Sequence, residues 1–199
     1  MLVQLRRSVI LALVALVLFG IAYPLIGTGL SQLIFKHQAN GSITANGSTL
    51  IGQNWAGPRW FHGRPDDTGP YAANPKANPP VPGGDNPLVA NGSSGASGAT
   101  NLGPRSKVLL TNTEALVAYW HRMGVNPTPD LVTTSGSGLD PNITPQDALV
   151  QIPMVSKARG VSRTALRQLI SSQTHPAELG FGSSYIVVLQ LNEALARLR

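Results

Sequence analysis

The stretch VILALVALVLFGIAYPLI, residues Val9–Ile26, decides the architecture of this chain. The longer segment Ser8–Phe35 contains no Asp, Glu, Lys, Arg or His, and as a helix it would be about 42 Å long. A bilayer core needs roughly 20 apolar residues, so this segment is long enough to cross a membrane. We therefore predict a short N-terminus at residues 1–7, a transmembrane helix at residues 8–35 and one domain at residues 36–199.

The charges that flank the apolar segment indicate its orientation. Arg6 and Arg7 precede it, whereas Lys36 and His37 follow it. Basic residues near a span favour the cytoplasmic side, so we predict a cytoplasmic N-terminus and a C-terminal domain outside the cytoplasm. A cleaved signal peptide, with a site at residues 27–29, is the alternative, although signal segments are usually shorter than this one. Both interpretations export the domain.

The composition restricts the function of the exported part. It has the length of one modest domain, and the whole chain contains 15 Lys and Arg against 9 Asp and Glu. The basic residues are scattered singly, which argues against nucleic acid as a partner. The absence of cysteine excludes disulfides, thiolate nucleophiles and cysteine-based zinc sites.

Helix signals are concentrated in the second half of the chain. Thr111 and Glu114 form a capping-box pattern that predicts a helix ending at Gly124. Cap and stop residues predict a second helix, which is capped by Thr144, broken or kinked at Pro153 and ended by Gly160. They also predict a third helix capped by Ser162, and a terminal helix is expected at Leu191–Leu198.

Short strands are predicted between turn signals, at Ser48–Gln53, Arg59–His62, Leu131–Thr134 and Tyr185–Leu189. Residues 65–105 are rich in Pro, Gly, Asn and Ser, which is typical of an irregular excursion. The fold class expected is therefore α/β, with a small mixed sheet and about four helices after the transmembrane helix.

Catalytic patterns are absent from the sequence. His37, His62, His121 and His175 are far apart and lack metal-ligand spacing. No G-x-S-x-G motif occurs. Asp140 and Asp147 flank a predicted helix start, where a carboxylate is favoured for structural reasons. The residues alone therefore predict a membrane-anchored, non-catalytic domain with no cofactor and no metal.

Several motifs, in a fixed order, resemble a known family over nearly the whole chain. They are Tyr23–Leu25, Gln38–Ser42, Ile51–Trp55, Trp60–Pro65 (WFHGRP), Asn101–Pro104, Ser135–Pro145 (SGSGLDPNITP), Gln151–Val155 (QIPMV) and Ala158–Gly160. Together they are similar to the C subunit of the bacterial Kdp potassium-transporting ATPase. Each block alone is weak, but FHGRP, SGLDPNITP and QIP at these distances are highly specific.

The resemblance implies a non-catalytic accessory subunit in a bacterial inner membrane. It implies two protein partners, a potassium-translocating subunit and a P-type ATPase subunit, besides the lipid bilayer. The family has also been described as a catalytic chaperone that binds ATP with the ATPase subunit. That alternative requires a cytoplasmic domain, whereas an exported domain would lie at the outer mouth of the potassium path. A stand-alone anchored enzyme or binding protein would need a convergent polar pocket that the sequence does not reveal.

The family motifs also supply candidate site residues. A partner-facing surface is expected for Asn54, His62, Arg64, Asp140, Asn142, Gln151 and Arg159. The alternative is that these residues hold turns and caps in place. Gly20, Gly27 and Gly29 are candidates for close helix packing in the membrane. The chain departs from the usual family pattern at Met154, where Arg is common, and at Gln190, where an acidic residue is common.

Overall fold

A computed structural model describes residues 1–53, 55, 57–65, 97, 99–177 and 182–198. The chain divides into two compact units, Met1–Ala45 and Asn46–Arg199. Asn54 and most of the excursion predicted at residues 65–105, namely residues 66–96 and 98, lie outside the described residues.

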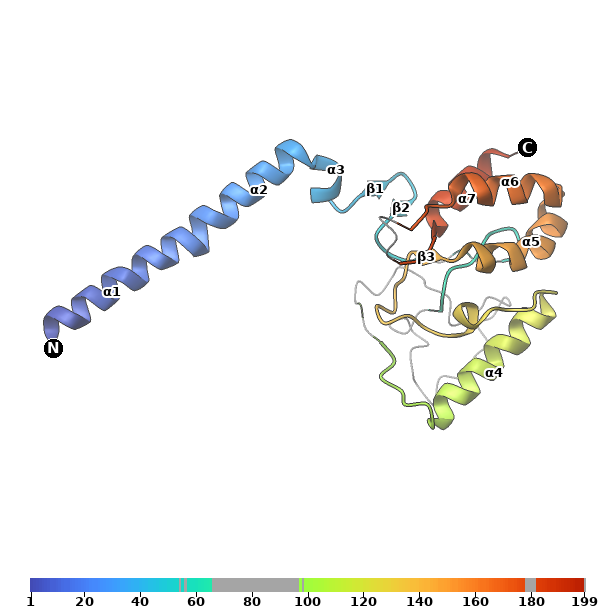
Figure 1. Cartoon of the computed structure of the whole chain (residues 1–199), viewed down its shortest axis with the longest axis horizontal. Helices are drawn as coiled ribbons and strands as arrows, with labels where there is room; N and C mark the ends of the chain where they lie inside the picture. Colours follow the sequence, from blue (N-terminus) through green and yellow to red (C-terminus); the bar gives the residue numbers. More distant parts are fainter. Residues whose placement is uncertain (54, 56, 66–96, 98, 178–181, 199) are drawn as a thin grey trace. The chain divides into compact units, whose positions relative to one another are not determined.

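One apolar helix of 33 residues, Leu2–Ile34, dominates the first unit (Figure 1). Among the described residues it is the one helix long and apolar enough to cross a membrane, and its side chains are almost all exposed. The helix begins at Leu2, upstream of the predicted start at Ser8. It comprises α1 (Leu2–Val17), the π-helical turn η1 (Leu18–Ala22) and α2 (Tyr23–Ile34), and the unit continues with α3 (Lys36–Ala39) and β1 (Ile43–Thr44).

The π turn η1 is explained by Pro24. A proline inside a helix has no N–H to donate, and its ring clashes with the carbonyl four residues earlier, here that of Gly20. The N–H of Tyr23 bonds to the carbonyl of Leu18, five residues back, which widens the helix locally. The apolar helix therefore passes Pro24 without interruption.

The second unit combines helices with very short strands, which confirms the α/β class. The strands β3 (Asn142–Ile143) and β4 (Ile186–Val187) form an antiparallel pair in which Ile143 lies opposite Ile186. The other elements described are β2 (Gly47–Ser48), α4 (Lys107–Arg122), the 3₁₀ helix η2 (Pro129–Val132), α5 (Pro145–Arg159), α6 (Arg163–Gln173) and α7 (Val188–Arg197).

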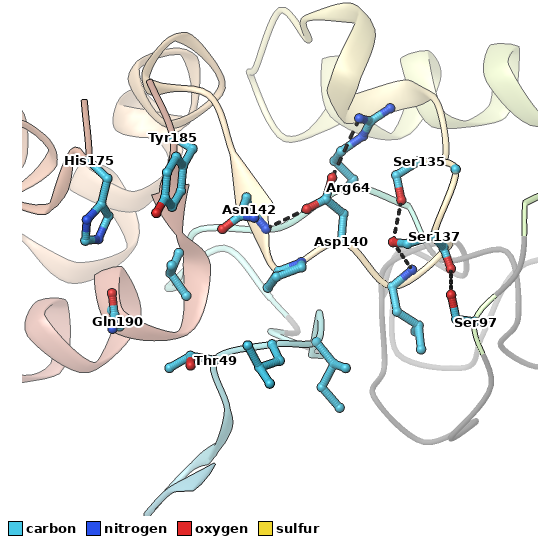
Figure 2. Close-up of a pocket in the computed structure, with 16 residues that line it drawn as sticks. Thr49, Arg64, Ser97, Ser135, Ser137, Asp140, Asn142, His175, Tyr185 and Gln190 are labelled. Carbon is cyan, nitrogen blue, oxygen red and sulfur yellow. Dashed lines mark hydrogen bonds and ion pairs between the residues drawn. The ribbon is translucent and has the colours of Figure 1, made fainter. Parts of the chain in front are cut away.

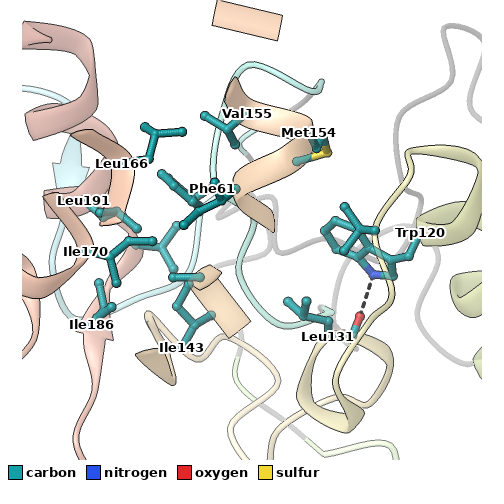
Figure 3. Packing of buried hydrophobic residues seen from close by; sticks show 14 of the residues in the cluster. Phe61, Trp120, Leu131, Ile143, Met154, Val155, Leu166, Ile170, Ile186 and Leu191 are labelled. Carbon is teal, nitrogen blue, oxygen red and sulfur yellow. Dashed lines mark hydrogen bonds between the residues drawn. The ribbon is translucent and has the colours of Figure 1, made fainter. Parts of the chain in front are cut away.

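One hydrophobic core joins the elements of the second unit (Figure 3). Helix α5 packs on α6, α6 packs on α7, and α4 packs on η2. Fully buried side chains from separate parts of the chain meet there, including Phe61, Trp120, Leu131, Leu166 and Leu191. Burying a side chain of this size stabilises the fold by roughly 1.5–3 kcal/mol. The core therefore holds the segment that carries Phe61 together with side chains of α4, α5, α6 and α7.

The predicted start and end of α5 and the predicted start of α6 are confirmed. Thr144 caps α5 through a capping box with Asp147, and Gly160 ends it in a left-handed conformation with φ 71°. Ser162 caps α6 by accepting a hydrogen bond from the N–H of Ala165. Of the break or kink expected at Pro153, the break is wrong, because α5 continues through this residue, and the kink stays a prediction. Burial of the adjacent apolar side chains offsets a proline cost of about 3 kcal/mol.

The predicted start of the first soluble helix is also wrong. Helix α4 begins at Lys107, because the hydroxyl of Ser106 accepts the N–H of Leu109 and so caps the helix one turn before Thr111. The stop at Gly124 follows the prediction, since α4 ends at Arg122 and Gly124 has φ 73°.

Most of the predicted strands are shorter or absent. Residues Leu131–Thr134 were expected to be extended, but η2 replaces the strand, since Leu131 and Val132 are both buried and a strand would turn them to opposite faces. Only Ile186–Val187 of the predicted strand Tyr185–Leu189 is strand, and α7 begins at Val188. The segments Ser48–Gln53 and Arg59–His62 are largely irregular.

Candidate functional site

Two buried amide side chains hold the backbone of Phe61 and His62. The amide of Asn192, on α7, accepts the N–H of Phe61 at 2.9 Å and donates to its carbonyl at 2.8 Å. The amide of Gln151, on α5, accepts the N–H of His62 at 2.8 Å and donates to its carbonyl at 3.1 Å. Both amides are fully buried. We call this arrangement the amide clamp; it supplies the hydrogen bonds that a neighbouring strand would otherwise make.

The ring of His62 is buried with the clamp. Its Nε2–H donates to the carbonyl of Gly57 at 3.0 Å, and the ring lies edge-on to Trp120 with centroids 5.3 Å apart. With 1% of its surface exposed, His62 cannot touch another protein in this fold. His62 and Gln151 therefore stabilise the domain from within, and we leave both out of the expected partner-facing surface.

Arg64 lies at the surface and joins three segments. Its guanidinium donates to the carbonyl of Thr133 at 3.3 Å and to that of Thr134 at 3.1 Å. It also forms ion pairs with Asp130 at 3.7 Å and with Asp140 at 3.8 Å. The three charged side chains remain partly exposed, so water screens the ion pairs and each contributes little to stability. Arg64 thus sets the position of the loop that follows η2.

That loop is stabilised by its own hydroxyl and carboxyl groups. The hydroxyl of Ser135 accepts the N–H of Gly138 at 3.0 Å, and that of Ser137 accepts the N–H of Leu139 at 3.2 Å. The carboxylate of Asp140 accepts the N–H of Asn142 at 3.0 Å, which forms a turn directly before β3. The motif SGLDPN therefore encodes a defined loop conformation.

An open groove of about 930 Å³ runs along this loop (Figure 2). Arg64, Asp140 and Asn142 line it together with Ser135 and Ser137. Its other wall carries the exposed side chains of Leu50 and Ile51 and the stacked rings of His175 and Tyr185, whose centroids are 5.0 Å apart. The structure thus brings Arg64, Asp140 and Asn142 onto one partly polar surface.

Arg159 lies at the C-terminal end of α5. Its guanidinium donates to the carbonyls of Arg59 at 2.9 Å and Leu195 at 2.8 Å and lies 4.5 Å from the ring centre of Trp60. Partial burial, and then the positive charge of Arg59, lower its pKa below the usual value. Arg159 therefore links α5 to α7 and to the segment before the amide clamp.

Comparison with known proteins identifies the family. A family model described as KdpC, the c chain of the K⁺-transporting ATPase, matches residues 5–197. The chain belongs to the KdpC family. The potassium-transporting ATPase KdpC subunit of Gloeobacter violaceus is 43% identical over 188 residues, which cover 90% of this chain and 88% of that protein. The KdpC subunit of Rhodopseudomonas palustris strain TIE-1 is 41% identical over 203 residues, 98% of this chain and 97% of that protein.

The other positions that the family resemblance singled out are three glycines of the apolar helix and the two departures from the family pattern, Met154 and Gln190. Apart from the neighbouring backbone of its own helix, a Cβ added at Gly27 or Gly29 would meet no described atom within 4 Å, and one at Gly20 would touch Leu16 at 3.4 Å. Close packing at these glycines stays a prediction. Met154 is buried in the core, which suits an apolar side chain in place of the usual Arg. Gln190 lines the groove.

The role of Asn192, and one of the two contacts of Asp147, were not predicted from the sequence. Asn192 follows Leu191 on the apolar face of α7. A buried amide side chain at such a position is a weak sign that it forms hydrogen bonds with backbone groups of a neighbouring segment. Asp147 accepts hydrogen bonds from the N–H of Thr144 at 2.7 Å and from the hydroxyl of Thr128. The second bond ties α5 to the segment before η2, and no local pattern could have predicted it.

Proposed function

We propose that the chain is a non-catalytic accessory subunit of an ATP-driven potassium uptake complex. It would assemble and stabilise the potassium-translocating and ATP-hydrolysing subunits. The observation that carries this proposal is the KdpC family match over residues 5–197. The motif side chains support it, because their polar groups hold the backbone of the domain: Gln151 holds the FHGRP segment, and Arg64 holds the loop after η2.

The orientation is part of the proposal. The apolar helix Leu2–Ile34 would anchor the chain in the cell membrane, with Arg6 and Arg7 on the cytoplasmic side. The second unit would then lie outside the cytoplasm, near the outer entry of the potassium path. There it could influence potassium entry sterically, while the anchor helix packs against partner helices through Gly20, Gly27 and Gly29.

The groove is the surface that we assign to a partner subunit. It presents Arg64, Asp140 and Asn142 beside the exposed Leu50 and Ile51. Stable protein interfaces combine apolar area with polar groups fixed in position. The loop geometry set by Ser135 and Asp140 supplies that fixed position. His62 and Gln151 would serve this surface indirectly, by holding the segment that bears Arg64.

The first experiment tests orientation, which separates this proposal from the catalytic-chaperone alternative. The chain contains no cysteine, so Ser172→Cys on the exposed side of α6 provides a single labelling site. We expect a membrane-impermeant maleimide to label Ser172→Cys in intact cells, and to label the matched variant Gln4→Cys only after the membrane is opened.

The opposite pattern, with Gln4→Cys labelled in intact cells and Ser172→Cys protected, would overturn the orientation. A cytoplasmic second unit could meet ATP, and the chaperone that binds ATP with the P-type ATPase subunit would become the function to pursue. Labelling of Ser172→Cys from outside would exclude direct contact with cytoplasmic ATP.

A further inference from the structure

A second cavity of the domain lies where α4 ends, α5 ends and α6 begins. Its volume is about 440 Å³, and three basic side chains line it: Arg122 from the last turn of α4, Lys157 from the last turn of α5, and Arg163 from the first turn of α6. The cavity is separate from the groove, and it shares none of the lining residues of the groove.

Among the described residues, no acidic side chain lines this cavity beside its three basic groups. All three residues are exposed, and the described lining of the cavity contains neither Asp nor Glu. Within the described part of the chain, both recorded ion pairs belong to Arg64, and none involves these three residues. The cavity thus gathers three positive charges that the described residues do not neutralise.

Arg163 places a positive charge at the N-terminus of a helix, where a positive charge is unfavourable. Arg122 and Lys157 lie near helix C-termini, where a positive charge is favoured by the helix dipole. Arg163 is the first residue of α6, at the positive end of the helix dipole, and the first turn of α6 has no acidic residue. Ser162 accepts the N–H of Ala165, and the ion pairs found among the described residues include none that balances the cation of Arg163. A bound anion would relieve this repulsion.

We propose that this cavity binds a phosphate group. The two arginines offer planar forks that match phosphate oxygens, and Lys157 adds a third charge. Met123, Pro153 and Met154 form an apolar side of the cavity, against which the uncharged part of a phosphate ester can lie. The phosphate comes either from inorganic phosphate or from a phospholipid headgroup, and the same three cations recognise both.

The test uses the full chain purified in a non-ionic detergent without phosphate. Thermal unfolding is followed by tryptophan fluorescence, since Trp120 is fully buried and reports on the domain. Inorganic phosphate is titrated in one arm and monomeric dihexanoyl phosphatidylglycerol in the other, at constant ionic strength set by chloride. A ligand that binds only the folded chain raises Tm in a saturable way.

The decisive variant is the double substitution Lys157→Gln with Arg163→Gln. Loss of two charge-assisted contacts should weaken the apparent affinity for phosphate by about tenfold or more. Arg167→Gln, one turn further along α6 and outside the cavity, is the matched control and should bind as the unmodified chain does. Without phosphate, the double variant should unfold at the same Tm or a higher one, because repulsion at the start of α6 is reduced.

Each outcome decides the proposal. Saturation by inorganic phosphate supports a small-anion site, and saturation only by phosphatidylglycerol supports a headgroup site. The proposal is overturned if neither ligand raises Tm beyond the effect of chloride. It is also overturned if the double variant responds as strongly as Arg167→Gln does.

Discussion

The segment Trp60–Pro65 is held in two different ways along its length. At Phe61 and His62 it is held by the amide clamp, whose two amide side chains are fully buried. Two residues later it is held by Arg64, whose contacts with Asp130 and Asp140 remain partly exposed to water. The buried clamp should therefore dominate stability, while the Arg64 contacts should shape a surface at little energetic gain.

The largest effect is expected from breaking the clamp. Gln151→Leu keeps the size of the side chain but leaves the N–H and carbonyl of His62 without their partners in a site that excludes water. Each such loss costs about 1–3 kcal/mol, so we expect the free energy of unfolding to fall by roughly 2–5 kcal/mol. The measurement is denaturant unfolding of the full chain in detergent micelles, followed by tryptophan fluorescence.

The matched control is Gln146→Leu, an exposed glutamine on the same helix. This variant should change the free energy of unfolding by no more than about 0.5 kcal/mol. Equal effects of the two substitutions would mean that the clamp contributes nothing beyond the packing of α5, and the contrast between buried and exposed contacts would be lost.

Arg159 offers an intermediate case between the clamp and the Arg64 contacts. Partial burial and the charge of Arg59 lower the pKa of Arg159, so its charged form is disfavoured there. The stabilising contribution of Arg159 therefore comes from the planar guanidinium group, whose N–H groups point at two carbonyls at once. Arg159→Lys keeps the charge but cannot reach the carbonyls of Arg59 and Leu195 while covering Trp60. We expect a loss of about 1 kcal/mol in unfolding free energy, measured by the same denaturation.

Arg167→Lys is the control for Arg159→Lys, because Arg167 is exposed on α6. It should leave stability unchanged within error. If Arg159→Lys were equally silent, positive charge alone would be sufficient at this position, and the fork geometry inferred from the two carbonyl contacts would be wrong.

Sequence patterns predicted several elements whose signals are local, although the helix start predicted from the capping box at Thr111 was wrong. The apolar helix, the caps of Thr144 and Ser162, and the stop at Gly160 each depend on residues within one or two turns, and the structure has them. The strand expected at Arg59–His62 failed because its hydrogen-bonding partners are side chains from α5 and α7, far away in the sequence. Tertiary contacts override local propensity in such segments.

The same distinction applies to the candidate site. Family motifs singled out Arg64, Asp140 and Asn142, and the structure brings them to one groove. They also singled out His62 and Gln151, whose burial could not be read from a motif. The basic cavity at Arg122, Lys157 and Arg163 was not predicted, because its residues come from three helices whose packing the sequence does not reveal.

The smallest effect on stability, and the sharpest test of the groove, comes from the two aspartates that pair with Arg64. Asp130 and Asp140 form similar ion pairs with it, at 3.7 and 3.8 Å, but only Asp140 lines the groove. Asp130→Asn and Asp140→Asn should each lower the free energy of unfolding by less than about 1 kcal/mol, since both pairs are screened by water. Potassium uptake by the assembled complex, in cells that depend on it, should fall for Asp140→Asn and remain normal for Asp130→Asn. Equal uptake by the two variants would mean that the groove does not contribute to potassium uptake. Arg64 would then have only the structural role of holding the loop after η2.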